Sequence, residues 1–119
     1  MTEYRGTDFS KRNKDVLVIT LGTEEESFDV KIKPPTVNIN KGMIKIAGLI
    51  DQAAKGELDY STFDMDECLE IVAETMSNNT DMRRITPEYL ASVGFDISDV
   101  GDFLGGYLLF ITRLVEGKN

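Results

Sequence analysis

The hydrophobic pattern of the chain changes its period at a pair of prolines, Pro34 and Pro35. Before the pair, apolar residues alternate with charged ones over 28–33, which is typical of a strand with one buried face. After it, apolar residues recur every three or four positions, which indicates amphipathic helices. Proline donates no hydrogen bond to a sheet, so the pair ends the strand. The sequence therefore predicts an α+β fold, predominantly helical, with the strands first.

The segment 14–33 is predicted to form a β-hairpin. A β-branched run at 16–19 pairs with the alternating strand, and the polar stretch 21–27 forms the turn. Gly22 supplies the backbone freedom that this turn needs. Residues 1–13 are polar and are expected to form a flexible arm, because few apolar side chains are available to anchor them.

Helical periodicity continues to the end of the chain, so 14–119 is expected to be a single domain. Thr86 followed by Pro87 is a strong start signal, since threonine caps the helix and proline is tolerated at its first position. Thr62 or Asp64 is expected to begin the helix before it. The predicted helices cover about 40–55, 64–78, 87–93 and 98–116.

The last predicted helix contains three glycines, Gly101, Gly105 and Gly106. Each costs about 1 kcal/mol relative to alanine inside a helix. Close packing of another backbone against this helix would offset the cost. A kinked helix, or one that starts later, is the alternative.

Charge limits the classes of partner. The 119 residues include 21 acidic and 13 basic ones, a formal net charge of −8. Proteins that bind nucleic acid or anionic membranes depend on Lys and Arg, so we expect neither partner. The N-terminus lacks the basic and apolar blocks of a signal peptide, and no apolar run approaches the roughly 18 residues of a membrane span. A cytosolic location is expected.

Residues suited to catalysis are scarce. The chain has no histidine, the commonest acid–base group and metal ligand near neutral pH. Its one cysteine, Cys68, lies on the apolar stripe of a predicted helix and is interpreted as a core residue. The acidic run 64–67 lacks the glycine and terminal glutamate of a calcium loop, and acidic residues favour a helix start anyway. No enzymatic activity is expected, and no catalytic, cofactor-binding or metal-binding residue is predicted.

Three passages carry a resemblance to a known family. The first is the strand that runs through the double proline into a helix, from Phe28 to Ala54. The second is the start of the short penultimate helix, from Ile85 to Leu90, and the third is the closing apolar helix, from Asp99 to Val115. In this layout, which spans about three-quarters of the chain, it resembles the tail assembly chaperones of long-tailed bacteriophages, in the form carried by Gram-positive phages and prophages.

The resemblance implies a non-catalytic protein that coats the aggregation-prone tape measure protein until tail tube subunits polymerise around it. It implies action in the host bacterial cytoplasm and absence from the finished virion. Tape measure protein is the expected partner, with tail tube protein as a further one. Self-association through the glycine-bearing helix or the hairpin edge is expected. Many genes of this family carry a ribosomal frameshift site near their end. The residues Gly117-Lys118-Asn119 can be encoded by GGA-AAA-AAC, a run that would suit such a shift, although other codons encode them equally well.

An apolar groove on such a protein would accept hydrophobic helical segments of its partner. The candidate contacts are aromatic residues of the last helix and methionines, whose flexible side chains adapt to varied surfaces. They are Phe103, Tyr107, Phe110, Met43, Met65 and Met76. Ordinary core packing is the competing interpretation for each of them.

Two other functions stay open. A small acidic inhibitor or DNA mimic would use the negative charge, with carboxylates at phosphate-like spacing along one surface. Another structural phage component, such as a head–tail or tail-completion protein, would be found in purified virions.

Overall fold

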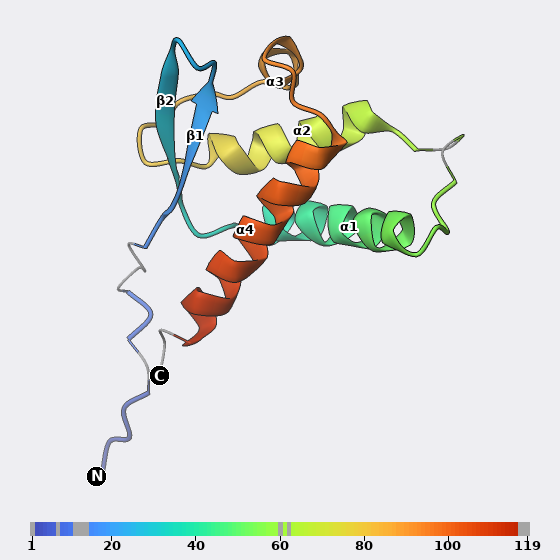
Figure 1. Ribbon diagram of the computed structural model, residues 1–119. Coiled ribbons are helices and arrows are strands. Elements are labelled where there is room, and N and C mark those ends of the chain that lie inside the picture. The colour runs from blue at the N-terminus through green and yellow to red at the C-terminus, as the bar shows by residue number, and fades with distance from the viewer. Residues whose placement is uncertain (1, 7, 11–14, 60, 62, 117–119) are drawn as a thin grey trace.

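The computed structural model describes residues 2–6, 8–10, 15–59, 61 and 63–116. In this part of the chain a hairpin precedes four helices, so the predicted α+β class with predominating helices is confirmed (Figure 1). The elements are β1 (Leu17–Gly22), β2 (Ser27–Ile32), α1 (Val37–Ala54), α2 (Met65–Ser77), α3 (Pro87–Ser92) and α4 (Ile97–Glu116).

The predicted arm and the end of the chain are described only in part. Residues 2–6 and 8–10 form no helix or strand and are exposed, while the flexibility of 1–13 stays a prediction. The residues 117–119 that would carry the frameshift signal lie outside the described part, as does residue 14 at the start of the predicted hairpin.

The hairpin has the predicted two-faced character. β1 and β2 are antiparallel, and the side chains of Val30 and Ile32 are buried while the alternating Asp29 and Lys31 are exposed. The turn is shorter than predicted, because Leu21 and its neighbour still pair with β2, so only residues 23–26 lie between the strands. A two-stranded ribbon is marginally stable alone and needs a partner to cover its apolar face.

Helix α2 covers that face and lies at the centre of the fold (Figure 1). It contacts β2, α1, α3 and α4. Its end is also tied to β2, since the backbone N–H of Lys33 donates to the carbonyl of Asn78 at 2.8 Å and that of Thr80 donates to Lys31 at 3.0 Å. The segment 78–80 therefore closes part of one edge of the hairpin. This leaves β1 as the edge strand for the predicted self-association.

Helix α1 begins at Val37, earlier than the predicted position 40. The reason is Thr36, whose side chain accepts a hydrogen bond from the backbone N–H of Ile39 at 3.3 Å. The caps predicted for the next two helices are present. The side chain of Asp64 accepts a hydrogen bond from the backbone N–H of Glu67, and that of Thr86 accepts one from the backbone N–H of Tyr89. Threonine and aspartate satisfy backbone donors that the first turn of a helix leaves unpaired.

We expect Gly22→Ala to lower the free energy of unfolding by more than about 1 kcal/mol, since alanine is strained at positive φ. Gly22 has φ +107°, and a Cβ placed on it would lie 2.3 Å from the carbonyl oxygen of Glu26. The matched control is Gly48→Ala in α1, where a Cβ meets no atom within 4 Å. Alanine there should stabilise by about 0.5–1 kcal/mol. Chemical denaturation measures both, and equal effects would contradict the turn geometry.

Candidate functional site

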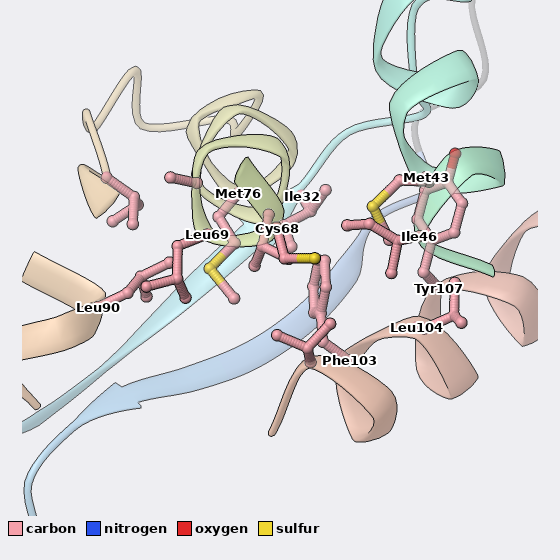
Figure 2. Close-up of a cluster of buried hydrophobic side chains, with 14 of the residues drawn as sticks. Ile32, Met43, Ile46, Cys68, Leu69, Met76, Leu90, Phe103, Leu104 and Tyr107 are labelled. Carbon is pink, nitrogen blue, oxygen red and sulfur yellow. The ribbon is translucent and has the colours of Figure 1, made fainter. Parts of the chain in front are cut away.

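Five of the six candidate contacts lie in the core and not on the surface. The exposed fraction is 7% for Phe103, 2% for Tyr107 and 8% for Phe110, and 1% for both Met43 and Met76. The apolar stripe of α4 faces α1, α2 and β1, and Phe103 and Tyr107 on this stripe pack inside the protein (Figure 2). Core packing therefore accounts for these five side chains, and a docking surface has to be sought elsewhere.

Tyr107 has a structural contact that the sequence did not suggest. Its hydroxyl donates to Oδ1 of Asn40 at 2.7 Å, which joins α4 to α1. Its ring lies beside Met43 and Ile46 of α1 (Figure 2). Burial raises the pKa of the Tyr107 hydroxyl above its usual value. The residue therefore stays a neutral hydrogen-bond donor that orients α4.

The sixth candidate, Met65, is half-buried and borders a large apolar hollow, called here the α1–α2 cleft. The cleft has a volume of about 600 Å³ and lies where the end of α1, the start of α2 and the start of α4 meet. Its apolar lining consists of Ala53, Leu58, Phe63, Met65, Phe95 and Ile97. Met65 is thus the one predicted contact that the structure leaves at a surface hollow.

A second apolar hollow, called here the α4 groove, lies at the opposite end of α4. It has a volume of about 320 Å³, and its walls are the Pro34–Val37 segment, Asn40 of α1, and Ile111, Leu114 and Val115 of α4. The side chains of Val37 and Val115 are 72% and 65% exposed. Exposed valines at a groove have no partner in the fold and suit contact with another protein.

The three glycines of α4 do not make the predicted close contact within the chain. A Cβ added to Gly101, Gly105 or Gly106 would meet no atom within 4 Å, and the helix starts before all three. The close approach occurs instead at Gly42 of α1, where a Cβ would lie 2.9 Å from Cγ2 of Ile71. Gly105 and Gly106 are exposed and Gly101 is half-buried. Since a Cβ on any of them would meet open space, their cost in helix stability is not offset by packing inside this chain.

The described residues include no group of three or more His, Cys, Asp or Glu side chains placed to hold a metal ion. Cys68 lies in the core, as expected, and burial raises the pKa of its thiol (Figure 2). The acidic run at 64–67 has structural roles: Asp64 caps α2, and the carboxylate of Glu67 pairs with Lys45 of α1. Neither feature provides a reactive centre.

Comparison of the chain with protein-family models, curated proteins and solved structures finds no match. Within the part of the chain that the structure describes, no helix has the length and apolar character needed to span a bilayer. The functional argument therefore depends on the two hollows and on the charges around them.

We expect Tyr107→Phe to lower the free energy of unfolding by about 1 kcal/mol, because Asn40 loses its hydrogen bond while the ring stays packed. Asn40→Ala should cost a similar amount, and the double variant little more than either. Urea unfolding measures the coupling. If Tyr107→Phe instead leaves stability unchanged and weakens partner binding, the residue is a contact and not a structural anchor.

We expect the thiol of Cys68 to react far more slowly with a disulfide reagent than a free thiol does at pH 8, since the reactive thiolate is disfavoured by burial. The rate should rise to the free-thiol rate when urea unfolds the protein. Because the chain has one cysteine, the absorbance change reports this site alone. Fast reaction under native conditions would contradict its burial.

Proposed function

We propose that this chain is a tail assembly chaperone of a long-tailed bacteriophage, which binds the tape measure protein and catalyses no reaction. The observation that carries the proposal is the α4 groove, an apolar hollow of about 320 Å³ flanked by exposed valines of two helices. A groove of this kind accepts the apolar face of a partner's helix. It replaces the buried aromatic and methionine residues as the expected docking surface.

The surface beside the groove supports a helical occupant. Leu108, Ile111 and Val115 follow one another at helical spacing and form a ridge along one side of α4. Leu108 is 47% exposed, so the ridge continues beyond the groove itself. No charged residue occurs between Phe103 and Thr112. An apolar helix can therefore lie along this stretch of α4, and Arg113, between Ile111 and Val115, is the first charged residue beyond it.

Charge explains how binding would keep such a partner from aggregating. A formal net charge of −8 on a chain of 119 residues makes each bound copy repel the next complex. A tape measure protein covered in this way would stay dispersed in the host bacterial cytoplasm until tail tube subunits displace the chaperone, which is then absent from the virion. Tail tube protein is a further proposed partner, as is a second copy of the chain through β1 or the outer side of α4.

The groove is tested by the double variant Val37→Ser/Val115→Ser, which removes its two most exposed apolar side chains. We expect its affinity for co-expressed tape measure segments to fall about tenfold or more, with the thermal unfolding midpoint little changed. The matched control is Val18→Ser/Met82→Ser, whose side chains are 52% and 90% exposed and belong to β1 and to the loop after α2, which do not line the groove. Equal losses in the two variants would show that the groove is not the docking site.

The identity of the partner is tested by affinity purification of the tagged protein from phage-producing cells, followed by mass spectrometry. Recovery of tape measure protein supports the proposal. Recovery of a host nucleic-acid-binding protein instead would favour the acidic inhibitor, and detection of the chain in purified virions would favour a tail-completion protein.

A further inference from the structure

We propose that the α1–α2 cleft is a second protein-binding site, which takes a basic amphipathic segment of a partner. Apolar side chains of that segment would enter the cleft, and its Lys or Arg residues would meet the acidic rim. This inference does not rest on the proposed function, because the cleft and the α4 groove lie at opposite ends of α4 and share no residue.

The cleft has the size and lining of a binding site. Its volume of about 600 Å³ falls within the range of pockets that enclose a ligand. Phe63, Phe95 and Met65 present aromatic and thioether surface, and each is only half-buried. Ile97, at the start of α4, is 43% exposed at the edge. Apolar surface of this extent stays in contact with water until a partner covers it.

Acidic residues occur in or directly beside each of the three segments that line the cleft. Asp96 lines the cleft itself and is exposed. Asp64 stands in the chain between two lining residues, and Glu57 and Asp59 flank the lining residue Leu58. The residues that immediately precede α2 and α4, and the segment that joins α1 to α2, therefore each place an acidic residue in or next to the lining of the cleft.

The acidic rim continues into a neighbouring hollow. Phe95 borders both hollows, and the second one is also lined by Asp99 and Asp102 of α4. The basic residue nearest to the cleft in the chain is Lys55, and its Nζ lies 3.0 Å from Oδ2 of Asp51. Lys45, which lies within electrostatic reach of Asp64, pairs with Glu67. Both lysines are therefore already paired with a carboxylate.

The uneven distribution of charge along the chain strengthens this argument. Residues 56–112 contain twelve of the 21 acidic residues and only two of the 13 basic ones, Arg83 and Arg84. The guanidinium of Arg83 is engaged in the hairpin, where it stacks 3.6 Å from the centre of the Phe28 ring. The cleft thus lies in the part of the chain that carries the whole negative excess.

Charge complementarity selects the occupant. A neutral apolar compound would fill the cleft and gain nothing from the rim, while an acidic partner would be repelled. An amphipathic helix with basic flanks matches both features at once, because its apolar residues recur on one face and its Lys or Arg residues lie beside them. This partner differs in charge from the uncharged apolar segment expected at the α4 groove.

The test uses synthetic amidated peptides of about 15 residues, with Leu and Phe on one helical face and Lys on the other. Control peptides carry Gln or Glu in place of every Lys. We expect the Lys peptide to bind the full chain in fluorescence anisotropy with one-to-one stoichiometry, at least tenfold more tightly than the Gln peptide, and the Glu peptide not to bind. Its affinity should fall as NaCl is raised, because salt screens surface charges. Equal binding of the Lys and Gln peptides would overturn the proposal.

Two charge-reversal variants locate the site. Glu57→Lys/Asp102→Lys changes the rim, and Glu24→Lys/Glu25→Lys makes the same change of net charge in the exposed hairpin turn. We expect the first to weaken binding of the Lys peptide about tenfold, and the second less than twofold. Equal weakening would mean that only net charge matters and would overturn the site. Circular dichroism melts check that both variants fold.

Methionine methyl signals in NMR give an independent location. We expect the Lys peptide to shift the signal of Met65 at the cleft and not that of Met82, which is 90% exposed in the loop after α2. A shift of Met82 alone would overturn the proposal. Sedimentation of the free protein tests whether a second copy of the chain fills the cleft. If the protein forms a dimer that dissociates in the variant Glu57→Lys/Asp102→Lys but is not dissociated by the peptide, then a second copy, and not a basic peptide, fills the cleft.

Discussion

The burial of α2 is the constraint on which the rest of the structure depends. A two-stranded hairpin has too little surface to be stable alone, and in this protein its apolar face packs against α2. The same helix contacts α1, α3 and α4. Six of its thirteen residues, including Cys68, Val72 and Met76, are buried. One cluster of buried side chains consequently includes residues of both strands and all four helices.

Because α1 and α4 both pack toward this centre, they cross each other instead of lying side by side over their whole length (Figure 1). Tyr107 and Asn40 join them through a hydrogen bond of 2.7 Å. Side chains fill the space between two crossing helices near the crossing and leave hollows toward their ends. The α4 groove lies at one end of α4 and the α1–α2 cleft at the other. The geometry of the core thus provides two separate surfaces for protein partners.

The two hollows differ in charge and hence in the partner that each suits. Residues 103–112 of α4, which lead into the groove, carry no charge, while Asp96 lines the cleft and further acidic residues adjoin its lining in the chain. Much of that acidic rim arises from helix starts, where aspartate caps the backbone: Asp64 begins α2, and Asp96 and Asp99 exchange hydrogen bonds at the start of α4. Side chains that stabilise the fold thereby also determine the electrostatic character of a binding surface.

Local patterns alone determined the order of strands and helices, the start signals at Asp64 and Thr86, and the need for glycine at position 22, because each depends on neighbours within a few residues. Only the tertiary structure decided which apolar residues face outward. Periodicity identifies the apolar side of a helix but not how much of it other elements cover, so Phe103 and Met43 are buried while Met65, Val37 and Val115 border hollows. For the same reason the tight contact is at Gly42 and not in α4, because the packing of α1 against α2 brings the side chain of Ile71 to it.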